Sequence, residues 1–388
     1  MRSQPAAGSS LDALTPEQRR LLVDFDAGKR AALARAISIV ENEQAGFQAL
    51  LNALHGRLGR AHRIGVTGPP GAGKSTLVAA LIALYRARGE RVGIIAVDPT
   101  SPFTGGALLG DRIRMNDVAL DDGVFIRSMA TRGRVGGLAL STKEVADVMD
   151  AFGFDRILVE TVGVGQSELD IAAAADSTVV VLVPESGDSI QAMKAGLMEA
   201  SDLFVINKSD RPGADRLARE VSLMLHLRTG RAMRRVPAHH GVDLKRAAAA
   251  RRPASRSASA AEGRIAGEPS PASDRHAAGA EASISKQQSW EIPVLQTVAE
   301  TGQGVEKLAE TLDAHRAWLG SSGQQAERRR ERLLERVRDE VDRQLRARVW
   351  RDRGRAALDA AMPELERGDA TPYQIASRIL ERFTRGEH

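Results

Sequence analysis

RIGVTGPPGAGKST, residues 63–76, is the stretch of sequence that decides the fold. Its first residues are largely apolar, as expected of a buried strand, and residues 75–88 carry an amphipathic helical pattern. Between them, residues 68–75 match the pattern G-x-x-x-x-G-K-[ST]. A glycine-rich turn between a strand and a helix presents backbone N–H groups at the positive end of a helix dipole, which suits phosphate. The stretch therefore predicts a P-loop that cradles the phosphates of a nucleotide.

Each position of this loop has an expected role. Lys74 is expected to reach the β- and γ-phosphates, and the Ser75 hydroxyl is expected to bind Mg²⁺. The other nucleotide contacts are expected from Gly68, Pro69, Gly71, Ala72, Gly73 and Thr76. A glycine-rich loop with an accidental lysine is the alternative, and the flanking strand and helix argue against it.

Seven short β-rich runs alternate with helical stretches through the middle of the chain. Several are apolar almost throughout, which is typical of strands buried on both faces of a parallel sheet. This alternation implies right-handed crossovers and an α/β fold, here a P-loop domain with a mostly parallel sheet flanked by helices. The predicted strands are residues 63–68, 91–98, 123–129, 155–161, 177–184, 202–208 and 293–299.

Composition and periodicity divide the chain into regions. We expect a disordered N-terminus over 1–14, a helical extension over 15–60 and the P-loop domain over 61–320. Within that domain, residues 239–288 are rich in Ala, Ser, Arg, Pro and Gly, so we expect a disordered insertion, with an interdomain linker as the alternative.

The C-terminal region, residues 321–388, is predicted to be helical. A long helix is expected over 324–353, with an apolar stripe over 333–349 and many i,i+4 pairs among its charged residues. A second helical piece is expected to begin near Thr371 and Pro372.

The motif NKSD, residues 207–210, lies at the end of a predicted strand and matches the guanine-reading N-K-x-D loop. A carboxylate at Asp210 can accept hydrogen bonds from guanine N1–H and N2–H₂, which adenine does not offer. With Asn207 and Lys208 it predicts GTP or GDP as the nucleotide. A further loop, Thr297-Val298-Ala299-Glu300, ends the last strand and is expected to contact guanine O6 through its backbone N–H groups.

Carboxylates lie at or just beyond two other predicted strand ends, which in parallel sheets face the ligand crevice. Glu160 stands where GTPases have the Asp of D-x-x-G, and Gly163 is expected to donate its N–H to the γ-phosphate. Asp98 and Asp111 are further candidates for the shell of Mg²⁺, with a turn-forming Asp-Pro as the alternative for Asp98. The candidate catalytic residues are Lys74, Glu160, Asp98 and Gln166, the last of which is expected to orient the attacking water.

Composition excludes several classes of protein. The chain has no cysteine, which removes disulfides, thiolate metal sites and cysteine nucleophiles and fits a reducing cytoplasm. No apolar run approaches the length of a membrane span, and the first residues lack the apolar segment of a signal peptide. The formal charge of +5 comes without any recognition motif, so we expect no nucleic-acid partner.

Five segments taken together resemble the MeaB/ArgK family of GTPases, which includes the methylmalonic aciduria type A protein. The segments are VTGPPGAGKST, VDPTSPFTGGALLGDRIRM, ETVGVGQSE, VPESGDSIQAMKAG and NKSD, in this order. The resemblance runs from about residue 15 to the C-terminus, apart from the insertion. It implies a homodimeric GTPase that chaperones an adenosylcobalamin-dependent acyl-CoA mutase, using GTP binding and hydrolysis to gate cofactor loading and to protect the mutase. It also implies that Asp98, Asp111 and Glu160 are the acidic residues associated with Mg²⁺.

The same resemblance implies roles for two further segments. Residues 184–194 resemble a loop that responds to the mutase, with Asp188, Gln191 and Lys194 at its polar positions. The C-terminal helices resemble a dimerisation arm. Two departures from the family pattern are the length of the insertion and Glu185, which stands where a small residue is expected.

Two other functions stay open. A kinase or transport-linked ATPase would have to accept adenine, which NKSD disfavours. A nickel metallochaperone GTPase would use Cys or His clusters, and the one adjacent pair here is His239-His240 at the edge of the insertion.

The sequence offers Arg132 and Arg134 as candidates for an arginine finger but identifies none. We therefore expect slow intrinsic hydrolysis that contact with a partner accelerates. The sequence does not distinguish methylmalonyl-CoA, isobutyryl-CoA and hydroxyisobutyryl-CoA mutases as the expected partner.

Overall fold

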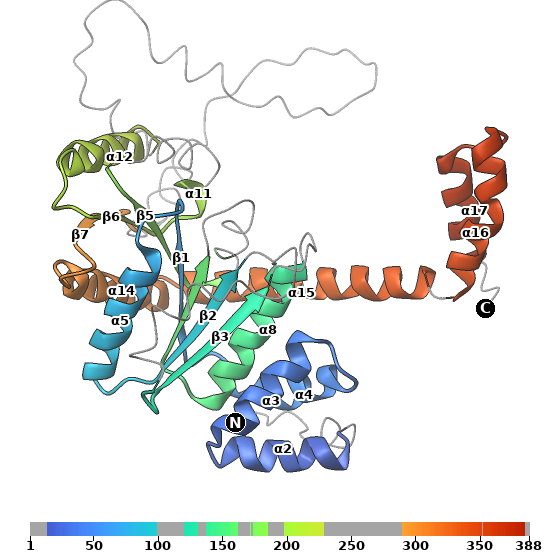
Figure 1. The fold of residues 1–388 in the computed structure, drawn as a ribbon, viewed down its shortest axis with the longest axis horizontal. Helices are drawn as coiled ribbons and strands as arrows, with labels where there is room; N and C mark the ends of the chain where they lie inside the picture. The colour runs from blue at the N-terminus through green and yellow to red at the C-terminus, as the bar shows by residue number, and fades with distance from the viewer. Residues whose placement is uncertain are drawn as a thin grey trace, which may run out of the picture.

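A single seven-stranded sheet forms the centre of the protein (Figure 1). The computed structural model describes residues 14–98, 120–130, 137–161, 171, 174–184, 198–228, 289–350 and 352–384. In spatial order the strands are β3 (Val124–Ala130), β2 (Val92–Asp98), β4 (Arg156–Thr161), β1 (His62–Thr67), β5 (Ser177–Leu182), β6 (Leu203–Asn207) and β7 (Val294–Thr297). Every pairing is parallel. The predicted α/β fold is confirmed, and the seven strands fall on the seven predicted runs.

Helices cover both faces of this sheet. The helices are α2 (Pro16–Asp26), α3 (Arg30–Glu41), α4 (Phe47–Leu54), the short 3₁₀ turn η1 (His55–Arg57), α5 (Lys74–Ala87), α8 (Gly137–Phe152), α11 (Met198–Ala200), α12 (Ala214–Arg228), α14 (Val305–Ser321), α15 (Gln324–Val349), α16 (Asp352–Arg367) and α17 (Pro372–Thr384). Ile95 and Val159 face the core under α8 and the N-terminal helices, whereas Ile94 and Leu158 face α5 and α14. Burial on both faces explains why the strands read as unbroken apolar runs.

The N-terminal extension is a layer of three helices outside α8 (Figure 1). Thr15 begins α2 with a capping box, because its hydroxyl accepts from the N–H of Gln18 while the Gln18 side chain accepts from the N–H of Thr15. Leu33, Ile37 and Val40 of α3 are fully buried in the core shared with α8. The extension is therefore packed as part of the main core on that side of the sheet.

The long C-terminal helix is shorter than predicted. Helix α15 ends at Val349 and the separate helix α16 follows, so the prediction of one helix over 324–353 is wrong. Gly354 lies in the first turn of α16, and a Cβ there would lie 1.7 Å from the Val349 carbonyl oxygen, so the close approach of the two helix ends requires glycine at this position. The charged pattern continues across this turn, which is why periodicity alone did not reveal it.

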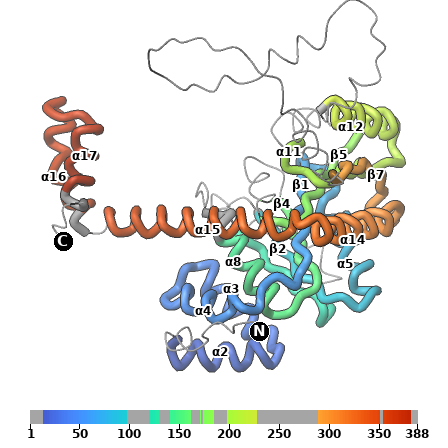
Figure 2. Tube along the Cα trace, turned by 180° about the vertical axis from the view of Figure 1, so that it is seen from behind, coloured from blue at the N-terminus to red at the C-terminus, as the bar shows by residue number. Residues whose placement is uncertain are grey.

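Helices α16 and α17 form a hairpin at the far end of α15 (Figures 1 and 2). Helix α17 begins at Pro372, as the sequence predicted, and Thr371 and Gln374 exchange the hydrogen bonds of a cap. Ile375 and Ile379 are buried against α16 in a small core of their own. The hairpin thus stands apart from the sheet domain, joined to it by α15.

Ion pairs to other elements hold the first half of α15 on the domain. Three arginines spaced four residues apart each meet an aspartate of another element, in the pairs Arg328–Asp202, Arg332–Asp176 and Arg336–Asp147. The first two pairs are 2.8 Å and 2.6 Å long. These three arginines therefore attach α15 to the sheet domain through pairs with other elements.

The predicted apolar stripe of α15 faces solvent in the single chain, except at Val349, which packs against the core of the hairpin. Leu333, Val337, Val341 and Leu345 are between 44% and 62% exposed. A row of four large apolar side chains in water is costly, so it marks a surface suited to burial against another protein surface.

A chain of buried hydrogen bonds links side chains at the amino ends of the central strands. Burial lowers the pKa of His62 to about 3, so this imidazole is neutral. Arg156 donates to His62 Nδ1, so the proton of His62 is on Nε2 and is donated to Ser177 Oγ, 2.7 Å away. Ser177 Oγ also lies 2.7 Å from His315 Nδ1, and His315 Nε2 lies 3.4 Å from Asp202. Arg156 thus sets the tautomer of His62.

Glu144 of α8 is a buried carboxyl group where α8 meets α15, and burial raises its pKa to about 7, although Arg336 and Arg343 oppose the rise. Because the folded-state pKa lies above the unfolded value, this group stabilises the fold fully below the unfolded pKa and loses that contribution as pH rises to about 7. We expect Glu144→Gln to stabilise the protein by about 3 kcal/mol at pH 8 and by much less at about pH 5. Urea unfolding at the two pH values measures this difference.

The matched control for Glu144→Gln is Glu331→Gln, which changes an exposed carboxylate on α15. The control should shift the free energy of unfolding equally at both pH values. An equal shift for Glu144→Gln as well would contradict the assignment of this carboxyl group as the pH-dependent one.

Candidate functional site

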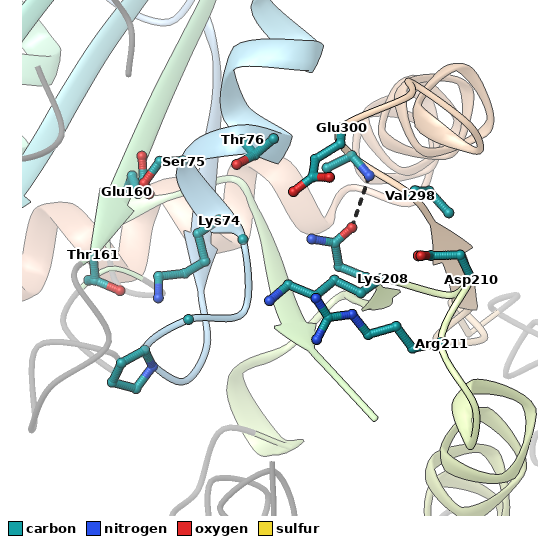
Figure 3. Close-up of a pocket in the computed structure, with 15 residues that line it drawn as sticks. Lys74, Ser75, Thr76, Glu160, Thr161, Lys208, Asp210, Arg211, Val298 and Glu300 are labelled. Atoms are coloured by element: carbon teal, nitrogen blue, oxygen red, sulfur yellow. Dashed lines mark hydrogen bonds between the residues drawn. The ribbon is translucent and has the colours of Figure 1, made fainter. Parts of the chain in front are cut away.

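A cavity of about 480 Å³ lies at the carboxyl ends of the central strands (Figure 3). Its lining combines the P-loop, the end of β4, the NKSD segment and the loop after β7. The lining residues are Pro70, Gly71, Gly73, Lys74, Ser75, Thr76, Glu160, Thr161, Asn207, Lys208, Asp210, Arg211, Val298, Ala299 and Glu300. Strand β1 lies at the middle of the sheet, with β4 and β5 on its two sides, which is where α/β sheets open a ligand crevice.

Two glycines of the P-loop occupy positions that no other residue fits. Gly68 has a φ of +139°, and a Cβ there would lie 2.1 Å from the Val181 carbonyl oxygen. Gly73 has a φ of +83°, and a Cβ there would lie 2.4 Å from Asn207 Nδ2. The loop is thus pressed against β5 on one side and against the NKSD segment on the other.

Lys74 begins α5 and is only 6% exposed. Its ammonium donates to the carbonyl oxygens of Gly68 at 2.9 Å and Pro69 at 3.0 Å, across the mouth of the loop. An ammonium held on two carbonyls in this way is already placed over the loop in which phosphates would sit. Phosphate oxygens are the stronger acceptors and would replace these carbonyls.

Ser75 and Glu160 meet at the start of α5. The Ser75 hydroxyl donates to Glu160 Oε1 at 2.6 Å, and both side chains are buried. A hydroxyl and a carboxylate beside a phosphate-binding loop are hard oxygen donors of the kind that Mg²⁺ takes together with phosphate oxygens and waters. These two residues therefore fit a magnesium ion bound with a nucleotide.

Asn207 joins the three motifs that the sequence singled out. Its side chain is 2% exposed, and its Nδ2 donates to the Ala72 carbonyl in the P-loop at 2.9 Å. Its Oδ1 accepts from the Thr297 hydroxyl and from the Ala299 N–H, each at 3.1 Å; the second bond is the dashed line in Figure 3. One buried amide therefore sets the distance between the P-loop, the NKSD segment and the loop after β7.

The NKSD turn carries backbone strain. Lys208 has a φ of +56°, a left-handed conformation that is uncommon for a residue with a side chain. Asp210 follows it at the rim of the same cavity (Figure 3). Strain at a position between two cavity-lining side chains is typical of a binding loop.

One charged residue of this cavity was missed from the sequence. Arg211 lines it beside Lys208 and Asp210, and Glu300, the last residue of the predicted loop 297–300, also lines it (Figure 3). Arg211 directly follows NKSD, so proximity in sequence was the available signal.

The other predicted site residues either lie at or behind the cavity wall or fall outside the described part of the chain. Ala72 and Thr297 are fully buried behind the cavity wall, and Gly68 and Pro69 contribute carbonyls to Lys74 rather than surface to the cavity. Asp98 ends β2, and its side chain lies outside the described part of the chain. Also outside it are Asp111, Gly163, Gln166, Asp188, Gln191, Lys194, Arg132, Arg134 and the pair His239-His240.

The described residues hold neither a cluster of metal-ligating side chains nor a membrane-spanning helix. They contain no group of three or more His, Asp or Glu side chains placed to hold a metal ion. Within the same ranges, every helix is too short or too polar to cross a lipid bilayer.

The family model and the two relatives described next, which all match this chain, are named as GTPases. The family model described as methylmalonyl-CoA mutase-associated GTPase MeaB matches residues 33–354. A Pyrococcus abyssi protein named as a GTPase is 40% identical over 359 residues, which cover 92% of this chain and 94% of that protein. The GTPase ArgK of Escherichia coli is 46% identical over 187 residues, covering 47% of this chain and 56% of ArgK.

A solved structure shares the fold. The crystal structure of a protein titled LAO/AO transport system kinase aligns with a TM-score of 0.60 over 96% of this chain and 99% of that chain, at 23% identity. At that identity the similarity supports the α/β architecture and the order of its elements.

Proposed function

The chain belongs to the MeaB family of methylmalonyl-CoA mutase-associated GTPases, and from this premise we propose that it is a GTP-hydrolysing chaperone of an adenosylcobalamin-dependent acyl-CoA mutase. The GTP site is the cavity of Figure 3. The observation that carries the assignment is the Asn207 side chain, which ties the P-loop, NKSD and the loop after β7 into one cavity. This arrangement supports phosphate binding at one end of that cavity and guanine recognition at the other.

Binding begins with an exchange of partners at Lys74. Its ammonium leaves the carbonyls of Gly68 and Pro69 for the β- and γ-phosphates, while the backbone N–H groups at the start of α5 take the remaining oxygens. At the other end, Asp210 accepts from guanine N1–H and N2–H₂. The loop at Val298 and Ala299 faces guanine O6.

Hydrolysis is an in-line attack of water on the γ-phosphate, which breaks its bond to the β-phosphate oxygen and releases GDP and phosphate. Ser75 and Glu160 would hold Mg²⁺, which neutralises phosphate charge when bound. Lys74 stabilises the negative charge that develops on the transferred group. Gln166 orients the water in this proposal, and Asp98 and Asp111 complete the acidic shell.

The exposed stripe of α15 supports a homodimer. Leu333, Val337, Val341 and Leu345 form a continuous apolar face on the part of the chain that resembles the dimerisation arm. In the same proposal the loop carrying Asp188, Gln191 and Lys194 transmits the nucleotide state to the mutase, so that hydrolysis times cofactor loading and protection.

The test of this function is the rate of GTP hydrolysis with and without a purified adenosylcobalamin-dependent mutase. Assays with methylmalonyl-CoA, isobutyryl-CoA and hydroxyisobutyryl-CoA mutases identify the partner. We expect slow release of phosphate from GTP alone, an increase of at least about tenfold with the cognate mutase, and no comparable rate with ATP. Hydrolysis that ignores all three mutases would contradict the chaperone role while leaving the GTPase assignment intact.

The same assay separates the other candidates. Preference for ATP, or transfer of phosphate to an acceptor other than water, would point to a kinase or transport-linked ATPase. Stoichiometric nickel binding would point to a metallochaperone, although the described residues offer no His, Asp or Glu cluster for it.

A further inference from the structure

A second cavity, of about 230 Å³, lies beneath the base of α15, and we name it the basal cavity. It is bounded by the first turns of α15, by α8 and by the segment from η1 to the start of β1. Figures 1 and 2 both show α15 passing beside α8 here, on the part of the molecule away from NKSD. A water in liquid occupies about 30 Å³, so the cavity has room for a small ligand.

Positive charge exceeds negative charge around the basal cavity. Five cationic side chains line it: Arg63, Lys143, Arg329, Arg332 and Arg336. Three carboxylates line it: Asp147, Asp150 and Asp176. The exposed Glu335, which lies outside the lining, pairs with Lys143 at 2.7 Å, and one cation is still in excess.

The carboxylates are already occupied by donors. Asp150 accepts from the backbone N–H groups of residues 59, 60 and 61 and from Arg63, which fills its oxygens. Asp147 accepts from Arg63 and Arg336. Asp176 accepts from Arg332 and from the N–H of Arg63. Every oxygen of these three carboxylates thus already accepts at least one hydrogen bond from a neighbouring donor.

Arg329 is the cation in excess. Its Nη2 donates to the Gly59 carbonyl oxygen at 3.1 Å, and within the described residues no carboxylate lies within ion-pair distance of it. A guanidinium carries five N–H donors in a fork that matches the two oxygens of a carboxylate or phosphate. Leu58, Ala61 and Leu333 supply an apolar wall on the same cavity.

We propose that the basal cavity binds a small oxyanion, a phosphate or a short-chain carboxylate, through Arg329. The anion supplies the negative charge and the paired acceptor oxygens that the lining lacks. Because Arg329 and Arg332 come from α15 while Arg63 comes from β1, a bound anion also strengthens the attachment of the C-terminal arm to the domain. Charge-assisted contacts of this kind are the strong class of hydrogen bond.

The test uses the full chain saturated with a non-hydrolysable GTP analogue and Mg²⁺, so that the γ-phosphate position of the P-loop is also filled and does not take the added anion. Inorganic phosphate and butyrate are titrated separately by calorimetry, against sodium chloride at matched ionic strength. We expect saturable binding of one anion per chain and a rise in unfolding temperature. Tighter phosphate binding identifies a phosphate site, and tighter butyrate binding identifies a carboxylate site. If neither anion binds more tightly than chloride, the proposal is wrong.

Arg329→Gln should weaken the anion affinity by about tenfold or more, which is the loss of one or two charge-assisted hydrogen bonds. Arg330→Gln is the matched control, because it removes the same charge from the neighbouring exposed residue of the same helix and should leave the affinity unchanged. Arg329→Lys keeps the charge but loses the forked pair of donors, so its anion affinity should lie between those of Arg329→Gln and Arg330→Gln. GDP affinity verifies that each variant is folded, and equal anion affinities for the two glutamine variants would refute the site.

Discussion

Replacing Lys74 with alanine is expected to weaken the binding of GTP and GDP by at least about a hundredfold and to abolish hydrolysis at ordinary nucleotide concentrations. The ammonium is nearly enclosed and is already held over the P-loop by the carbonyls of Gly68 and Pro69. Alanine removes two charge-assisted hydrogen bonds to phosphate, each worth about 1.5–3 kcal/mol. Titration with a fluorescent guanine nucleotide measures the loss directly.

Lys307→Ala is the control for this experiment. Lys307 is an exposed lysine on α14 that pairs with Glu310, so its removal lowers the net charge equally without touching the cavity. The unfolding temperature of each variant without nucleotide separates loss of binding from loss of structure. Unchanged affinity of Lys74→Ala for GTP would show that the nucleotide binds elsewhere.

Replacing Asp210 with asparagine is expected to change which base the protein accepts. The carboxylate accepts from guanine N1–H and N2–H₂, whereas an amide offers one acceptor and one donor, which matches xanthine. We expect the affinity for GTP to fall by about a hundredfold or more and that for xanthosine triphosphate to rise above it. Competition between the two nucleotides for a fluorescent GDP analogue gives both affinities.

Asp215→Asn serves as the matched control, because Asp215 is an exposed aspartate at the start of α12 that accepts from Gln296. It should leave the preference for GTP intact. If Asp210→Asn kept that preference too, the base would have to be read by other groups, and Arg211 and Glu300 at the same rim would be the next to vary.

The strands and the phosphate loop were predictable because their physics is local. A strand buried on both faces must be apolar along its length, and a loop that surrounds phosphates must have glycine where φ is positive. Gly68 and Gly73 meet that requirement against Val181 and Asn207. The motif therefore predicted the loop conformation as well as its ligand.

The contacts of α15 were not predictable, because they join residues that are far apart in the sequence. Arg328, Arg332 and Arg336 recur every four residues among acidic neighbours, which in sequence is typical of a solvated helix face. Their aspartates belong to segments far away in the chain, so only the folded sheet brings them together. The same holds for Asn207, whose motif predicted a base-reading loop but not the bond to the P-loop.

The long sequence separation between α15 and the N-terminal helices has a consequence for the order in which the protein is built. Arg343 pairs with Glu43 across 300 residues of sequence, and Gln48 donates to Glu340 across 292. During synthesis the N-terminal helices emerge first, yet these contacts must wait until α15 has left the ribosome. This face therefore assembles late, because it depends on contacts between segments that are far apart in the sequence. Until then the aspartates that pair with the arginines of α15 stay exposed to water.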